Sequence, residues 1–128
     1  MKRILNIVLL LITFGFTSNA QRVAELDRNG KLKICNLDKN NYTSHCATIA
    51  SGVVDMSMGG DRIAILYSNG KLKVCRIDDN NYTENCSTIE SRGVSDVLVR
   101  GSTIIIYYDN GKRRTCGLDR NNYTNNCN

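Results

Sequence analysis

The chain has 128 residues, of which 17 are basic, 12 acidic and six cysteine, with one histidine and no proline or tryptophan. A chain of this length holds one modest hydrophobic core, which excludes a multidomain organisation. The formal net charge of +5 is mild, so composition alone does not indicate a nucleic-acid-binding protein.

Residues 1–20 have the pattern of an export signal. Lys2 and Arg3 precede an apolar run over residues 4–16, and small residues follow at Ser18 and Ala20. The run has 13 residues, whereas a membrane-spanning helix needs roughly 20. We therefore predict a signal peptide that is removed after Ala20.

Removal of the leader takes away two basic residues, which leaves 15 basic against 12 acidic residues and a net charge of +3. We expect residues 21–128 to form a single all-β domain without a membrane span. The expected location is secreted or extracellular, or the periplasm or cell surface if the source is a bacterium.

An internal repeat organises the chain after the leader. Three segments align with ten of 21 positions identical in all of them, at offsets of 40 and 41: residues 26–46, 66–86 and 107–127. Such a period indicates that one supersecondary unit is built three times. The expected units span about residues 21–50, 51–90 and 91–128.

Each unit has the pattern of about four short strands. An apolar stretch such as residues 62–66 leads to an Asn-Gly pair, which predicts a two-residue type I′ hairpin turn with positive φ at both central residues. A second strand alternates lysine with apolar residues, as in residues 71–74. A third strand begins near the second cysteine of the unit, and spacers such as residues 52–58 predict a fourth.

All six cysteines lie after the leader, and an even number in a short exported chain predicts a disulfide framework in an oxidising compartment. Every pair is spaced C-x10-C and His45 is the only histidine, so no metal site is expected. Six cysteines permit 15 pairings. The repeat selects the bonds that close equal local loops: Cys35–Cys46, Cys75–Cys86 and Cys116–Cys127.

Two architectures fit three units of this size. In the first, four-stranded sheets stack like the blades of a propeller, with both faces packed against neighbours. In the second, a β-trefoil, the three units close on each other. Strands that are apolar throughout, such as residues 62–66, favour blades because both of their faces are covered. We expect an all-β fold of three propeller-like four-stranded blades stapled by disulfides, with the β-trefoil as the alternative.

Residues 51–75 also resemble a blade of the regulator-of-chromosome-condensation type of propeller, with a strand, Gly59-Gly60, an apolar strand, a glycine turn and an outer strand. Residues 93–116 share the resemblance. Asp61-Arg62 stand where that family has a histidine, and Cys75-Arg76 where it has an aromatic residue. The resemblance therefore implies a fold and no function.

The end units are more polar than the middle one. Glu25 in the first unit replaces Ile65 and Ile106 of the others, and Arg113 in the third replaces a leucine. An open stack requires polar terminal units. Three blades are too few to close a ring, so the chain either stays a short stack or completes a ring with copies of itself.

Each predicted disulfide joins the two ends of a segment that contains an Asp-x-Asn-Asn-Tyr-Thr loop. Planar hydrogen-bonding groups beside an aromatic ring bind sugars, and three copies would gain strength by multivalency. Alternatively the loops are structural, with tyrosine packed over the disulfide. The candidate glycan-binding residues are Asp38, Asn40, Asn41, Tyr42, Asp78, Asn80, Asn81, Tyr82, Asp119, Asn121, Asn122 and Tyr123.

The same loops contain Asn-Tyr-Thr sequons at Asn41, Asn81 and Asn122, which are glycosylation candidates in a eukaryotic host. Glycans there would shield the loops. A calcium site is not expected, because the loops lack the glycine and the distal glutamate of a calcium-binding loop, and no cofactor is expected either.

Basic residues occupy matching positions on the second strand of each unit and would form a stripe that attracts a polyanion such as a sulfated glycan. Lysines on an exposed strand also solubilise an edge. An exported chain is not expected to bind nucleic acid. The stripe consists of Lys31, Lys33, Lys71, Lys73, Lys112 and Arg114.

Catalysis is not expected, because no nucleophile can be matched with a histidine and a carboxylate. The sequence therefore predicts an exported binding or adhesion module for a surface or extracellular glycan. The alternatives are a secreted inhibitor or effector that binds a partner protein, and a weak polyanion binder.

Overall fold

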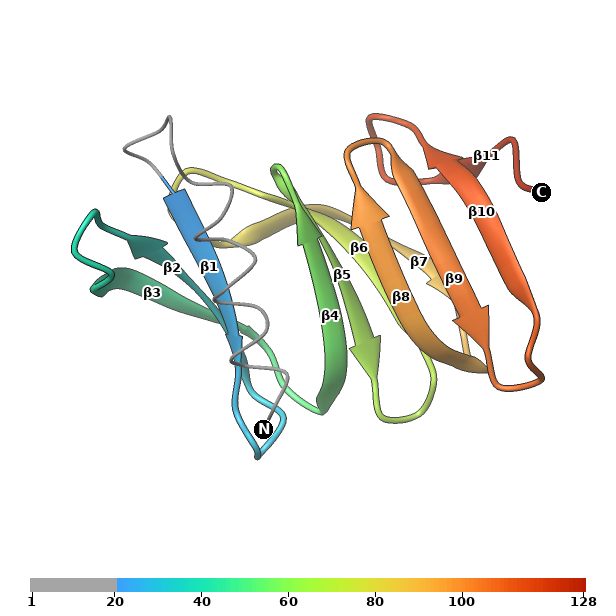
Figure 1. Cartoon of the computed structure of the whole chain (residues 1–128), viewed down its shortest axis with the longest axis horizontal. Coiled ribbons are helices and arrows are strands. Elements are labelled where there is room, and N and C mark those ends of the chain that lie inside the picture. The colour runs from blue at the N-terminus through green and yellow to red at the C-terminus, as the bar shows by residue number, and fades with distance from the viewer. Residues whose placement is uncertain (1–20) are drawn as a thin grey trace.

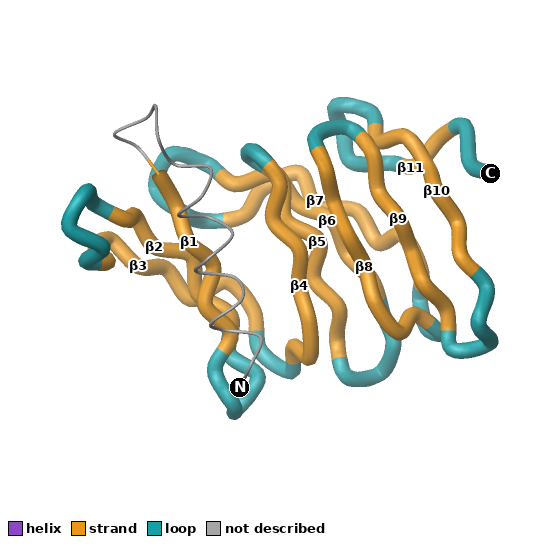
Figure 2. The backbone as a smooth tube through the Cα atoms, viewed as in Figure 1, coloured by secondary structure: helices purple, strands orange, loops and turns teal. Residues whose placement is uncertain are grey.

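The computed structural model describes residues 21–128, which form strands and turns and contain no helix. The predicted leader lies outside the described residues. The strands form three antiparallel sheets (Figures 1 and 2). The prediction of an all-β chain with disulfides is confirmed. Within the described part of the chain, no helix has the length and apolarity to span a membrane.

Each sheet is a meander of strands that follow one another in the chain. The first contains β1 (Gln21–Leu26), β2 (Leu32–Leu37) and β3 (Thr43–Ala50). The second contains β4 (Val53–Gly59), β5 (Arg62–Tyr67), β6 (Leu72–Ile77) and β7 (Thr83–Glu90). The third contains β8 (Val94–Arg100), β9 (Thr103–Tyr108), β10 (Arg113–Leu118) and β11 (Thr124–Asn125).

The first sheet has three strands in the described residues, one fewer than the four predicted. A strand equivalent to β4 and β8 would have to precede Gln21. The second and third sheets have the predicted four strands.

The middle sheet is covered on both faces, as the apolar strand β5 predicts. Ile63 and Ile65 belong to a core shared with the first sheet, whereas Ala64 and Leu66 belong to a core shared with the third. The three sheets therefore stand in a row, with the first and the third at opposite ends (Figure 1). The β-trefoil alternative is wrong, because it requires the three units to close on each other.

The Asn-Gly turns are not the predicted type I′ turns. In the first, Gly30 has a φ of 85° and Asn29 is not among the residues with positive φ. The Gly30 N–H donates to the Asp27 carbonyl at 3.1 Å, and the Asp27 N–H donates to the Lys31 carbonyl at 3.0 Å. Pairing resumes only between Leu26 and Leu32, so the loop is a longer turn that contains a left-handed glycine.

A disulfide ties the second strand of each sheet to the third: Cys35–Cys46, Cys75–Cys86 and Cys116–Cys127. These are the within-unit pairs that the repeat predicts. The residue before each second cysteine has a left-handed backbone, with φ of 53° at His45, 51° at Asn85 and 49° at Asn126. In the first two sheets the strand pairing shifts at this point, which is a β-bulge that bends the third strand.

Candidate functional site

The three loops that carry the candidate residues, called here the Asp-Tyr loops, span residues 38–42, 78–82 and 119–123. Figure 1 shows them along the upper edge of the molecule, each between the last two strands of its sheet, and the Asn-Gly turns along the lower edge. The row of sheets therefore presents the three loops on one side.

The aspartate of each loop forms the turn. Asp38 Oδ1 accepts the backbone N–H of Asn40 at 2.8 Å and that of Tyr42 at 2.9 Å. Asp78 and Asp119 accept the matching pair of N–H groups in their own loops. Such bonds bend a chain without help from other parts of the fold. The aspartate side chains thus hold the loops in shape.

The second asparagine of each loop has a left-handed backbone, with φ of 67° at Asn41, 70° at Asn81 and 68° at Asn122. Asn81 and Asn122 are 0% exposed, whereas Asn41 is exposed. The three residues have the same local conformation, so the difference in burial comes from their surroundings.

Asn81 and Asn122 each join their loop to the preceding sheet. Asn81 Nδ2 donates to the Asn36 side-chain oxygen at 3.0 Å and to the His45 carbonyl at 2.8 Å. Asn122 Nδ2 donates to the Asn85 carbonyl at 2.8 Å. The Oδ1 atoms of Asn81 and Asn122 are buried without a hydrogen-bond partner in residues 21–128, which reduces the net gain in stability.

Two arginines support the same junctions. Arg22 donates to the Asp78 carbonyl at 2.8 Å, and Arg62 donates to the Asp119 carbonyl at 2.7 Å. The backbone of the second and third Asp-Tyr loops is therefore held by the sheet before it.

The prediction that Asn81 and Asn122 contact or carry a glycan is wrong, because both side chains are buried between two sheets. Only Asn41, among the three sequon asparagines, has an exposed side chain in the folded chain. Sequence reasoning missed this difference, since the three loops have the same letters.

The tyrosines are the exposed part of the loops. Tyr42 is 71% exposed, Tyr82 56% and Tyr123 59%, so the interpretation that they pack over the disulfides is wrong. Asn40, Asn80 and Asn121 are also exposed. Large exposed aromatic side chains commonly mark a surface that binds something.

A pocket of about 250 Å³ lies between the second Asp-Tyr loop and the first sheet. Its base is the first disulfide bulge, and its wall is the loop from the second sheet. Sequence reasoning missed the contribution of the first sheet, because the pocket exists only where two units meet. The lining residues are Asn36, His45, Cys46, Ala47, Asp79, Asn80 and Tyr82.

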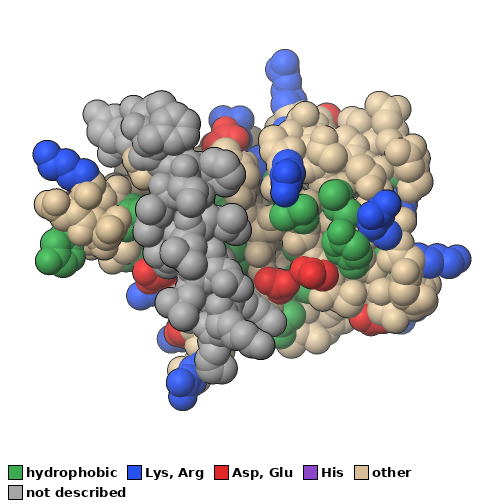
Figure 3. Space-filling view, in the orientation of Figure 1, with side chains coloured by type: hydrophobic (Ala, Val, Ile, Leu, Met, Phe, Trp, Pro, Cys, Tyr) green, Lys and Arg blue, Asp and Glu red, His purple; other side chains and the backbone are tan. Residues whose placement is uncertain are grey.

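Several members of the basic stripe make local contacts. The ammonium groups of Lys71 and Lys73 each lie 5.7 Å from the centre of the Tyr67 ring, a cation–π arrangement. Arg114 lies 3.5 Å from Glu90. On the face shown in Figure 3, lysine and arginine side chains are scattered over the surface and its outline and do not gather in one patch.

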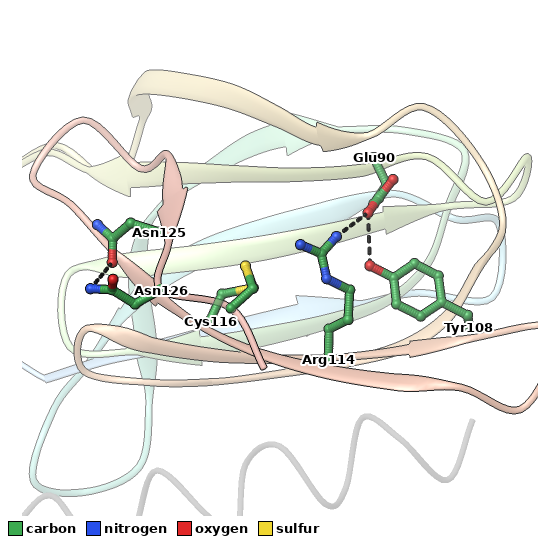
Figure 4. The surroundings of a disulfide bond; sticks show 7 residues. Glu90, Tyr108, Arg114, Cys116, Asn125 and Asn126 are labelled. Atoms are coloured by element: carbon green, nitrogen blue, oxygen red, sulfur yellow. Dashed lines mark hydrogen bonds and ion pairs between the residues drawn. A yellow bond between two sulfur atoms is a disulfide. The ribbon is translucent and has the colours of Figure 1, made fainter.

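Glu90 also links the second and third sheets through Tyr108, whose hydroxyl donates to the Glu90 carboxylate at 2.7 Å (Figure 4). Burial raises the pKa of the Tyr108 hydroxyl, and the hydrogen bond to Glu90 raises this pKa further. Within residues 21–128, no group of three or more histidine, cysteine, aspartate or glutamate residues is placed to hold a metal ion.

No family model and no curated protein matches the chain. Solved structures do match it, and one of them is the crystal structure of human WBSCR16, a protein similar to the regulator of chromosome condensation. The match has a TM-score of 0.57 at 14% identity and covers 80% of this chain and 34% of that chain. The chain thus spans about a third of that protein, and a likeness at this identity concerns the fold alone.

Proposed function

We propose that this chain is an exported binding module whose sheets act as propeller-like blades and whose Asp-Tyr loops bind a surface or extracellular glycan. Three disulfides in a chain of this size are typical of an oxidising environment outside the cytoplasm. The leader-like residues 1–20 support export.

The observation that carries the proposal is the pocket beside Tyr82. The exposed ring offers an apolar face to sugar C–H groups, and the neighbouring Asn80, Asn36 and His45 offer donors and acceptors for hydroxyl groups. Its volume of about 250 Å³ is below the roughly 300–1,000 Å³ of pockets for drug-sized ligands. A single sugar unit is therefore the expected occupant.

The other two loops extend the site along the same edge. Tyr42 and Tyr123 are exposed like Tyr82, and each has an exposed asparagine two positions before it. A branched or repeating glycan can reach several loops, so three weak contacts combine into one stronger attachment.

A glycan array tests the proposal. The wild type should bind a defined set of glycans, and Tyr82→Ala should reduce binding by about tenfold or more, since an aromatic contact of about 1.4 kcal/mol corresponds to that factor. Arg28→Ala, at the opposite edge, is the matched control and should bind as the wild type does. If no glycan binds, or if Tyr82→Ala binds like the wild type, the proposal is wrong.

A protein partner is the second candidate, because exposed tyrosines in a row are also typical of protein interfaces. This candidate predicts that no glycan on the array binds. It also predicts that the chain captures one protein and that this capture is lost when the same tyrosines are replaced. A polyanion is less well supported, since Lys71, Lys73 and Arg114 already contact neighbouring side chains.

A further inference from the structure

The first and third sheets each carry a charged residue where the other units have an apolar one, and the two charges are opposite. We propose that the third sheet of one copy of this chain binds the first sheet of another copy, head to tail. The proposal concerns the mature chain, which is predicted to begin at Gln21, and it is independent of the glycan proposal. The interface would join the face of the first sheet that points away from the second to the outward face of the third.

The two junctions within the chain give the template for this contact. Ile65 of β5 lies in one core with Leu32 of β2, and Ile106 of β9 lies in one core with Leu72 of β6. At both junctions the following sheet thus supplies an isoleucine and the preceding sheet a leucine.

The register of the strands locates the same positions on the outer faces of the first and third sheets. Glu25 pairs with Lys33 as Ile65 pairs with Lys73, so Glu25 holds the isoleucine position on the first sheet. Arg113 pairs with Tyr107 as Leu72 pairs with Leu66, and it holds the leucine position on the third sheet.

Stacking of the third sheet of one copy on the first sheet of another would bring Arg113 to Glu25. An arginine–carboxylate pair then stands where the internal junctions have a leucine and an isoleucine of one core. Opposite charges at matching positions favour the head-to-tail arrangement. They disfavour a contact between two first sheets or between two third sheets, in which like charges would meet. Arg113 is exposed and Glu25 is half-buried.

The outward face of the third sheet carries apolar side chains beside Arg113. Leu98, Ile105 and Tyr107 are half-buried, although Ala64 and Leu66, which match Ile105 and Tyr107, are fully buried by the next sheet. Hydrophobic side chains gather over β8 and β9 in Figure 3. A face of this kind fits another sheet of the same repeat.

The first Asp-Tyr loop supplies a second matched contact. Asn41 has the backbone of Asn81 and Asn122, which donate to the carbonyl of the left-handed residue in the sheet before them. On the third sheet that left-handed residue is Asn126, beside the Cys116 disulfide (Figure 4). In the head-to-tail contact Asn41 of one copy would therefore donate to the Asn126 carbonyl of another.

Two internal contacts have no equivalent at this interface. At the internal junctions the first strand of the following sheet, β4 or β8, packs on the sheet before it, whereas the first sheet has no such strand among the described residues. Thr103 occupies the position at which Arg22 and Arg62 hold the next loop. The contact between copies is therefore weaker than the internal junctions and depends on protein concentration. Repetition of a head-to-tail contact gives a closed ring or an open chain of copies.

The test measures molar mass by light scattering and sedimentation over a concentration series. The full chain is produced with its own leader in an oxidising compartment, so that processing and disulfide formation occur. The wild type should form species of two or more copies. Glu25→Arg and Arg113→Glu should each lose these species, because like charges then face each other.

A mixture of the two variants provides the decisive comparison. In an equimolar mixture the arginine introduced at position 25 of one variant meets the glutamate introduced at position 113 of the other. The unchanged Glu25 and Arg113 form the second contact, so the larger species should return. The double variant should also assemble. A monomeric wild type at the highest soluble concentration, or a mixture that stays monomeric, would overturn the proposal.

Asn41→Gly is a second probe that keeps the fold, since glycine adopts the left-handed backbone readily. It should weaken association by about tenfold and leave the melting temperature of the dilute monomer unchanged. If it leaves association unchanged, the loop contact is wrong.

Discussion

The side-chain amide of Asn81 donates a hydrogen bond of 2.8 Å to the backbone carbonyl of His45, across the junction between the second and first sheets. The junction is therefore held by a polar contact at its edge as well as by its apolar core. The same asparagine in the first loop, Asn41, has no sheet before it among the described residues.

Asn81→Gly should lower the free energy of unfolding by about 2 kcal/mol, because the Asn36 and His45 oxygens lose their donor and a buried space opens. Asn41→Gly, with the same backbone conformation and an exposed side chain, should change it by less than about 0.5 kcal/mol. Urea unfolding at a concentration where the chain is monomeric measures both. Equal losses in the two variants would show that the junction contact is unimportant.

Gly70→Ala should destabilise the protein more than Gly111→Ala. Both glycines have a φ of 85°, so the backbone strain of alanine is shared. A Cβ atom at Gly70 would lie 2.6 Å from the Gly93 nitrogen, whereas nothing lies within 4 Å of one at Gly111. We expect an additional loss of about 1–3 kcal/mol for Gly70→Ala, measured by thermal unfolding. An equal loss of stability in both variants would contradict the close approach of the Gly70 turn to Gly93, next to the third sheet.

Replacement of Cys75 and Cys86 by alanine should lower the free energy of unfolding by about 3 kcal/mol, since the crosslink removes that much loop-closure entropy from the unfolded chain. Non-reducing peptide mapping of the wild type should recover the pair Cys75–Cys86. Recovery of bonds between different sheets would contradict the within-unit pairing.

The hydrogen bond between Tyr108 and Glu90 should make stability fall at high pH. The pKa of Tyr108 is raised in the folded chain from its ordinary value of 10.0, so the folded state holds this proton more tightly than the unfolded state does. The resulting stabilisation is complete below the unfolded pKa and is lost as pH rises through the folded pKa.

Tyr108→Phe provides the comparison for this pH effect. The difference in unfolding free energy between the wild type and Tyr108→Phe should shrink as the pH rises from the ordinary tyrosine pKa of 10.0 through the raised pKa of the folded chain, as measured by urea unfolding. A difference that is constant over this range would show that the raised pKa does not contribute to stability.

Features that depend on neighbouring residues within one unit were predictable from the sequence. Alternation along residues 71–74 and the apolar stretch at 62–66 predicted β6 and β5, since a strand exposes successive side chains to opposite faces. The repeat predicted the pair Cys35–Cys46, because the two cysteines close a short local loop. The aspartate turns also follow from local hydrogen bonds.

Features that arise between units depend on how the sheets pack and were not predictable from the sequence. Asn41 and Asn81 lie in loops of nearly the same sequence, and only the first sheet, packed against the second, buries Asn81 and builds the pocket beside Tyr82. The turn at Gly30 is longer than the predicted two-residue type I′ turn, because β1 and β2 pair only as far as Leu26 and Leu32. Burial and register are properties of surfaces in contact, and residues far apart in the sequence create those surfaces.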